Sequence, residues 1–192
     1  MLALLTSLGL AGLASAQVSI TAGTNPRAVA INPVTNKIYV ANVNSANVTV
    51  IDGKNNSATT VATGTTPIAI AINPATNKIY VANSSSSNIT VIDGANNSVT
   101  TVAAGINPFA VAINPVTNKI YVANLNSANV TVIDGSNNSV TTVAAGTTPF
   151  AVAFNPVTNK IYLANFSSSN VTVIDGSNNS VTTVAAGSTP FA

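Results

Sequence analysis

The 192-residue sequence contains no cysteine, histidine, glutamate or tryptophan, and only ten of its residues carry a charge. Without cysteine the chain forms no disulfide and offers no thiolate to a metal ion. Without histidine it has no imidazole to activate a serine or to bind a metal. Its acids are four aspartates spaced 41 residues apart, so no carboxylate pair suited to glycoside hydrolysis is expected. The sequence therefore predicts no catalytic residue, no metal site and no cofactor, and we expect a protein that is not an enzyme.

The positive charges are also few, and they are scattered along the chain. The six cations are Arg27, Lys37, Lys54, Lys78, Lys119 and Lys160, and the formal net charge is +2. Nucleic-acid binding relies on clustered lysines and arginines that neutralise phosphates. Because no such cluster occurs, we expect no nucleic-acid partner.

The first sixteen residues differ in composition from everything that follows. Residues 1–16 form an apolar run that ends in Ala-Ser-Ala, a small-residue pattern typical of a signal-peptidase site. No lysine or arginine precedes this run, which is unusual for a signal peptide, and the alternative is a buried N-terminal helix. The run is too short to span a bilayer comfortably. We expect an exported protein, whether periplasmic, secreted or at the cell surface, with no membrane span after the signal is removed.

One phrase recurs four times at a constant spacing. NPVTNKIYVAN stands at residues 32–42, and nearly the same string returns at 73–83, 114–124 and 155–165. A proline opens each unit, and successive opening prolines lie 41 residues apart, at Pro26, Pro67, Pro108, Pro149 and Pro190. The chain therefore contains four complete repeats, at residues 26–66, 67–107, 108–148 and 149–189.

Each repeat carries four strand signals separated by turns. In the third repeat the β-rich runs are 108–115, 119–124, 129–135 and 139–146, and the third run ends in Asp-Gly, a strong turn dipeptide. In the first run Val111 and Ile113 alternate with Ala110 and Ala112, so the sheet can pack on both faces, with large residues toward one neighbour and small residues toward the other. Four short strands in about forty residues predict the blade of an all-β propeller with four-stranded antiparallel blades. The alternative is a β-solenoid, whose coils are usually shorter.

The repeat resembles the YVTN family of β-propeller repeats. The resemblance covers residues 26–189 and is carried by the segment KIYVAN…NVTVIDGSNNSVTTVAAGTTPFAVAINPVTN, in which the name-giving tetrapeptide reads Tyr-Val-Ala-Asn or, in the last copy, Tyr-Leu-Ala-Asn. The resemblance implies a propeller, commonly seven-bladed, of the kind found in exported and cell-surface proteins, including surface-layer proteins. Related propellers include lactonases and dehydrogenase domains that carry haem or quinone.

The ends of the repeat region suggest an incomplete ring. Residues 17–25 place Gly23 in register with Gly64, Gly105 and Gly146, which predicts the fourth strand of a blade that lacks its first three. Residues 190–192 are the stub of a further blade. We therefore expect an open arc with apolar faces at both ends, through which the chain can self-associate. A closed four-bladed ring is the alternative.

Three of the residues that recur in every repeat could carry chemistry, and each has a structural explanation. The aspartate before the Asp-Gly glycine is expected to accept backbone hydrogen bonds in its turn. The lysine that opens the second strand is expected to be a solvated edge charge. The tyrosine in the second strand is expected to belong to the core between blades. These recurring residues are Asp52, Asp93, Asp134, Asp175, Lys37, Lys78, Lys119, Lys160, Tyr39, Tyr80, Tyr121 and Tyr162.

The copies differ mainly at two loop positions, and these predict a binding face. The first follows the opening proline, and the second follows the Tyr-Val-Ala-Asn phrase; in a propeller both loops emerge on the same face. Loops on a rigid scaffold are the usual seat of binding, although drift after recent duplication also explains such variation. The candidate binding residues are Arg27, Phe109, Phe150, Leu125 and Phe166. We expect a non-enzymatic binding or cell-surface scaffold whose partner is a protein or a surface glycan. The alternative is part of an enzymatic or cofactor-carrying propeller, such as a lactonase-like protein.

Overall fold

A computed structural model describes residues 18–191 and contains sixteen β-strands in this part of the chain. Blade 1 comprises β1 (Pro26–Asn32), β2 (Lys37–Asn42), β3 (Asn47–Asp52) and β4 (Ala58–Ala62). Blade 2 comprises β5 (Pro67–Asn73), β6 (Lys78–Asn83), β7 (Asn88–Asp93) and β8 (Val99–Ala103). Blade 3 comprises β9 (Pro108–Asn114), β10 (Lys119–Asn124), β11 (Asn129–Asp134) and β12 (Val140–Ala144). Blade 4 comprises β13 (Pro149–Asn155), β14 (Lys160–Asn165), β15 (Asn170–Asp175) and β16 (Val181–Ala185).

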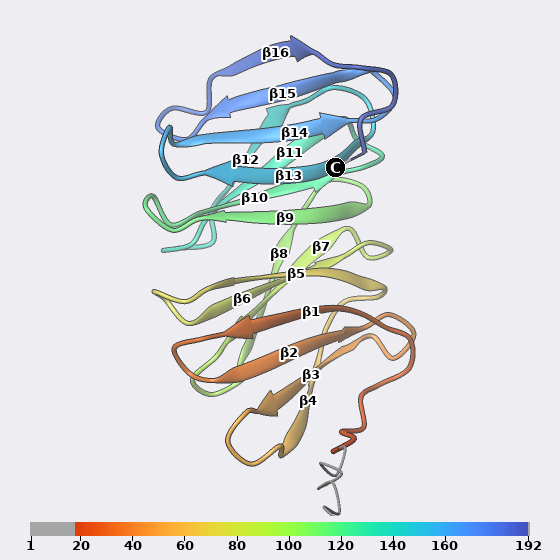
Figure 1. Ribbon diagram of the computed structural model, residues 1–192, viewed down its shortest axis with the longest axis vertical. Coiled ribbons are helices and arrows are strands. Elements are labelled where there is room, and N and C mark those ends of the chain that lie inside the picture. The colour runs from red at the N-terminus through yellow and green to blue at the C-terminus, as the bar shows by residue number, and fades with distance from the viewer. Residues whose placement is uncertain (1–17, 192) are drawn as a thin grey trace, which may run out of the picture.

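Every blade is a simple antiparallel meander, as the sequence predicts. Each sheet has four strands in chain order, and neighbouring strands pair in the same register in all four blades. Within residues 18–191 there is no helix, and hence none that is long and apolar enough to cross a membrane. The blades follow one another along the long axis of the molecule, with β1, β5, β9 and β13 side by side (Figure 1). These first strands therefore lie innermost, and the fold is a propeller arc.

The tight turns are made by residues that tolerate a left-handed backbone. Asn36, Asn77, Asn118 and Asn159 close the first turn of each blade with φ between 51° and 54°. The turn between the third and fourth strands repeats the same solution with a second asparagine at φ 61° or 62°. Asparagine adopts this region more readily than most residues because its short polar side chain can hydrogen-bond locally. Asparagine thus serves the protein in two ways, because it adopts the left-handed backbone of the turns and its amide interacts with water.

The blades pack through two chemically distinct faces. We call the face turned toward the preceding blade the leading face and the face turned toward the next blade the trailing face. Between blades 2 and 3, the trailing face supplies Ala69, Tyr80, Ala82, Ile89, Val91 and Val102, and the leading face supplies Val111, Ile113, Ile120, Val122 and Ile133. The same positions meet between blades 1 and 2 and between blades 3 and 4. Small residues of the first strand thus face one neighbour and large ones the other, as predicted.

The arc is open. Blade 1 and blade 4 lie at opposite ends of the molecule (Figure 1), and each leaves one face uncovered. Val29 and Ile31 on the leading face of blade 1 are 66% and 61% exposed. Tyr162 on the trailing face of blade 4 is 37% exposed, whereas Tyr39, Tyr80 and Tyr121 are fully buried between blades. The expected inter-blade role of the tyrosine holds wherever a following blade exists.

Residues 18–25 do not form the fourth strand that the sequence predicts for 17–25. Within the described residues they pair with no strand and remain irregular. Their register is nevertheless the predicted one, since a Cβ on Gly23 would meet Ser45 and Asn42 just as a Cβ on Gly64 would meet Ser86 and Asn83. The signal-like residues 1–16, Gln17 and Ala192 lie outside the described residues.

Candidate binding rim

The arc has two rims with different chemistry. The turns that join first to second strands and third to fourth strands form the charged rim, which carries nine of the ten charged residues. The loops that join second to third strands, together with the linkers between blades, form the aromatic rim. Arg27, at the start of β1, is the one charged residue of the aromatic rim within residues 18–191.

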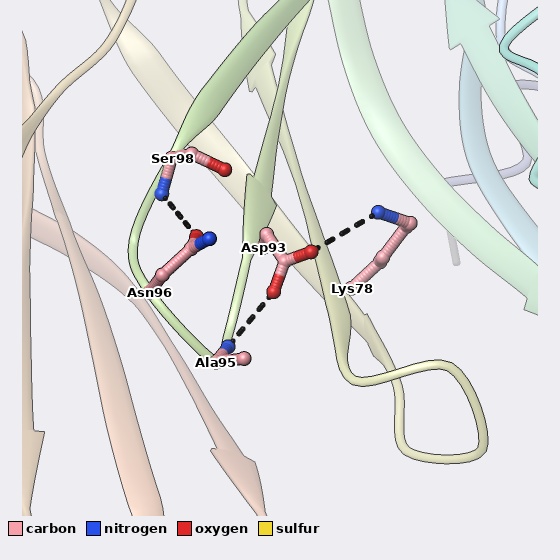
Figure 2. A network of polar contacts seen from close by, with 5 residues as sticks. All are labelled: Lys78, Asp93, Ala95, Asn96 and Ser98. Carbon is pink, nitrogen blue, oxygen red and sulfur yellow. Dashed lines mark hydrogen bonds and ion pairs between the residues drawn. The ribbon is translucent and has the colours of Figure 1, made fainter.

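On the charged rim the aspartates serve the turns in which they lie. Asp93 Oδ1 accepts the backbone N–H of Ala95 at 2.9 Å, and Lys78 Nζ lies 3.5 Å from Asp93 Oδ2 (Figure 2). These two contacts, the hydrogen bond first, lower the pKa of the Asp93 carboxyl below its ordinary value. The corresponding aspartate of each other blade accepts the same backbone hydrogen bond. The structural explanation of the recurring aspartate is therefore confirmed.

The candidate binding residues at the start of each blade share an unusual backbone position. Pro26 pairs with Asn42 and Ala28 with Ala41, which leaves Arg27 as the extra residue of a β-bulge. The same shift in register leaves Ile68, Phe109 and Phe150 as the unpaired bulge residues of the other three blades. A bulge releases its residue from the alternation of the strand and redirects the side chain. The variable position thus lies outside the regular alternation of the strand, at the rim end of the blade.

These bulge residues meet one another across the blades. The Phe109 and Phe150 rings are tilted at 48° with centroids 4.4 Å apart. Arg27 Cζ lies 5.9 Å from the Phe109 centroid, within the range of a cation–π contact, although blade 2 stands between them in the chain. Ile68, the bulge residue of blade 2, is only 9% exposed. The structure therefore brings together three of the five candidate residues.

The remaining candidates lie in the loops of the same rim. Phe166 contacts Phe191 edge-on with centroids 6.5 Å apart, and Phe191 stacks on Phe150 at 4.3 Å. Leu125 is half-buried, and its backbone N–H donates to the carbonyl of Asn107, two residues before Phe109. Ile68 and Phe191 are not among the binding residues predicted from the sequence. The signal was present, because Phe191 follows Pro190 just as Phe150 follows Pro149.

Hydroxyl pairs hold the loops of this rim to the linkers. Thr66 Oγ1 and Ser85 Oγ are 2.7 Å apart, and Thr148 Oγ1 and Ser167 Oγ are 2.8 Å apart. Ser84 also donates to Asn107 Oδ1. Each of the three linkers between blades also donates a backbone N–H to a loop serine, as in Thr147 to Ser168 Oγ at 3.0 Å. The aromatic rings and the guanidinium of this rim thus lie on loops that hydrogen bonds hold in place.

The chemistry of this rim suits binding. Phenyl rings offer flat apolar surfaces, Arg27 offers a cation with planar donors, and serine, threonine and asparagine offer neutral hydrogen-bonding groups. Within residues 18–191 no three metal-ligating side chains come together. The arrangement can therefore hold an apolar or aromatic group, with a negative charge placed near Arg27.

Comparison with known proteins identifies the fold. The chain matches no protein-family model and no curated protein sequence. Among solved structures it is similar to hydrazine synthase of Kuenenia stuttgartiensis, with a TM-score of 0.75 and 22% identity over 90% of this chain and 52% of that one.

It is also similar to virginiamycin B lyase of Staphylococcus aureus, with a TM-score of 0.73 and 12% identity over 84% and 56% of the two chains. The RRP9 WD40 repeats align with a TM-score of 0.72 and 12% identity over 86% of this chain and 52% of that one. The chain spans about half the length of these structures. With its four repeated antiparallel blades, the chain is a β-propeller repeat protein.

Proposed function

We propose that this propeller is a non-enzymatic binding scaffold that uses its aromatic rim to hold a partner outside the cytoplasm. The observation that carries the proposal is the bulge at the start of each blade, which directs the variable residues Arg27, Phe109 and Phe150 to one place. The rest of the repeat remains nearly constant because it must pack between blades. A conserved frame with variable, clustered rim residues is the usual organisation of a binding surface.

The partner we propose carries an apolar or aromatic group beside a negative charge, on a protein or a surface glycan. The rings of Phe109, Phe150 and Phe166 would provide contact area, and Arg27 would pair with the anion. Aromatic residues and arginine are the residue types that most often dominate binding energy at interfaces. The neutral serines and threonines of the loops are suited to a hydroxyl-rich partner surface.

Replacing the three phenylalanines by serine tests the role of the rim. We expect F109S/F150S/F166S to weaken binding to the producing cell's envelope fraction by about tenfold or more, because each ring is a candidate anchor. The matched control is V34S/V116S/V157S, which removes three exposed apolar side chains from the charged rim. Binding measured on immobilised proteins should survive in the control. Equal binding by both variants would contradict the proposal.

The export part of the proposal rests on residues 1–16 and on the resemblance to the YVTN family. Expression of the whole chain in a secreting bacterium should yield a protein outside the cytoplasm that begins at Gln17. N-terminal sequencing of the exported fraction measures this directly. A chain that keeps residues 1–16 and stays in the cytoplasm would contradict export and, with it, a cell-surface role.

The alternative is a portion of an enzymatic or cofactor-carrying propeller. Two similar structures, a hydrazine synthase and a lyase, favour it, although at 22% and 12% identity they show the fold alone. Adjoining sequence that brought histidine, glutamate or cysteine to the propeller axis would support it. Haem or quinone titration of the chain, followed by absorbance, tests it without that sequence: retention of the cofactor would favour the alternative.

A further inference from the structure

The two uncovered faces of the arc are a leading face and a trailing face, and these are the two surfaces that join blades inside the molecule. The leading face of blade 1 presents Val29, Ile31, Ile38, Val40 and Ile51, which correspond to Ile70, Ile72, Ile79, Val81 and Ile92 of blade 2. The trailing face of blade 4 presents Tyr162, Ala164, Val171, Val173 and Val184, which correspond to Tyr121, Ala123, Val130, Val132 and Val143 of blade 3. The uncovered faces thus keep the side chains of a blade junction.

Both faces are hollowed where the side chains of a neighbour would pack. A hollow of about 210 Å³ lies beside Val29 and Val40 on blade 1. A second hollow, of about 400 Å³, lies beside Tyr162, Ala164 and Val171 on blade 4. Large apolar side chains from a leading face fill the corresponding space over Tyr80 and Tyr121 within the arc. The shape as well as the composition of the trailing face is therefore that of an unfilled junction.

The polar contacts across blade junctions are also left incomplete at the two ends. At each internal junction a buried asparagine at the end of the first strand donates to the turn asparagine of the next blade: Asn32 to Asn77 at 2.9 Å, Asn73 to Asn118 at 2.8 Å and Asn114 to Asn159 at 2.6 Å. The next donor in this series is Asn155, which is only half-buried, and the acceptor that precedes the series is Asn36, which is exposed. One end thus offers a donor and the other an acceptor.

We propose that a second copy of this chain covers both faces, head to tail, so that blade 4 of each copy packs against blade 1 of the other. Each contact is heterologous, because it joins the leading face of one copy to the trailing face of the other. Two copies joined in this way close into a ring of eight blades, within the range that propellers adopt. Each copy supplies four blades, so two copies supply the eight blades of such a ring. This proposal is independent of what the aromatic rim binds.

The C-terminal tail marks where the second copy would sit. Phe191 stacks on Phe150 at 4.3 Å and thereby occupies the bulge position of a following blade. In the ring, Arg27 of the second copy takes that position, and residues 187–191 turn aside because residues 23–27 of the second copy need the same place. A Cβ added to Gly187 would meet nothing within 4 Å, whereas Gly64, Gly105 and Gly146 are crowded, so the tail is packed less closely at this point than the linkers inside the arc.

The mass in solution tests the proposal. Size-exclusion chromatography with light scattering should give twice the chain mass of 19.1 kDa for the full-length protein. Val29→Asp places a charge on the leading face of blade 1, and Tyr162→Asp places one on the trailing face of blade 4. Each should prevent pairing and so halve the measured mass. Val34→Asp is the matched control, because Val34 is 74% exposed in the same blade but lies in a turn. A monomeric wild-type protein, or dissociation by only one of the two face substitutions, would overturn head-to-tail pairing.

Cross-linking distinguishes the closed ring from other assemblies. The chain has no cysteine, so the variant N36C/N155C carries thiols only at the proposed junction, and these lie at opposite ends of one copy. A short bis-maleimide should convert this variant to a covalent dimer and stop there, since two copies close the ring. N36C alone should remain uncross-linked. A ladder of larger species, or a dimer of N36C alone, would overturn the proposal.

Discussion

The exposure of the tyrosine in the second strand depends on whether another blade follows its own. Tyr39, Tyr80 and Tyr121 are fully buried, and none of their hydroxyls hydrogen-bonds to another described residue. Burial, with a smaller contribution from Asp134, raises the pKa of Tyr80 to about 12; burial, with Asp175, does the same for Tyr121. Tyr162 has the same sequence context but is 37% exposed because no blade follows.

Removing one of these buried hydroxyls should stabilise the protein. A buried hydroxyl without a partner loses its hydrogen bonds to water, so Tyr80→Phe is expected to raise the free energy of unfolding by on the order of 1 kcal/mol. The midpoint of urea denaturation measures this. Tyr162→Phe, measured in protein dilute enough that no second copy covers blade 4, serves as the control and should change stability little, since the Tyr162 side chain is then in contact with solvent. A lower midpoint for Tyr80→Phe would mean that the hydroxyl has a stabilising partner.

The raised tyrosine pKa values predict alkaline destabilisation. Between pH 10 and about 12 the unfolded chain releases tyrosine protons that the folded chain still holds. The unfolded state then binds fewer protons, so stability falls as pH rises through this window. Thermal unfolding followed by circular dichroism should show a decreasing Tm from pH 10 upward. The double variant Y80F/Y121F should have a shallower decrease; an unchanged slope would rule out these residues as its source.

At the scale of the blade, the glycines of the linkers allow close approach between loops. A Cβ on Gly105 would lie 2.4 Å from Ser127 Oγ and 2.7 Å from Asn124 Cγ. Gly105→Ala is therefore expected to cost about 1–3 kcal/mol, as overpacking usually does. Gly187→Ala is the matched control, because its Cβ would meet nothing within 4 Å. Chemical denaturation of the two variants checks the difference, and equal costs would contradict the crowding.

The asparagine series that links blades can be tested in the same way. Asn114 and Asn155 both accept backbone N–H bonds in their own turn, but only Asn114 also donates to the next blade. In protein dilute enough to be monomeric, Asn114→Ala should therefore cost more than Asn155→Ala, by about 1–3 kcal/mol, because it also leaves the side-chain carbonyl of Asn159 without its donor. Urea denaturation of the two variants measures this difference. If the costs were equal, the cross-blade hydrogen bond would contribute nothing to stability.

At the scale of the whole molecule, the arc behaves as a row of similar units whose stability depends on their neighbours. Blades 2 and 3 are covered on both faces, whereas blades 1 and 4 are covered on one. In repeat proteins the stability of each unit is roughly a sum of its own contribution and those of its interfaces. The terminal blades should therefore open more readily than the central ones unless a second copy covers them.

Amide hydrogen exchange can follow this difference blade by blade. In dilute protein, β2 and β14 are expected to exchange faster than their counterparts β6 and β10, because local opening is easier where fewer apolar contacts must break. Raising the protein concentration should slow exchange in β2 and β14 specifically if the ring of two copies forms. Mass spectrometry of proteolytic fragments measures both effects. Uniform exchange across the four blades at low concentration would contradict the dependence on neighbours.

The sequence alone was sufficient to predict the 41-residue period, the four strands of each blade, the turns and the inter-blade tyrosine. These features depend on neighbours in the chain: alternation of apolar residues, turn dipeptides and the identity of side chains at each period. The predicted strands of the third repeat, for example, agree with β9 to β12 within two residues at their ends. The candidate residues Arg27, Phe109 and Phe150 were also found from sequence, as variation against a constant frame.

Only the tertiary structure decided which of these residues meet, and how. The bulge that redirects Arg27 and Phe109 is a shift in strand pairing, and contact between residues two blades apart depends on the curvature of the arc. The difference between Tyr121 and Tyr162 likewise has no local cause, since both stand in nearly identical strings. A repeated sequence specifies each blade equally, but burial and contact across blades depend on what packs beside each one, and that is a property of the assembled arc.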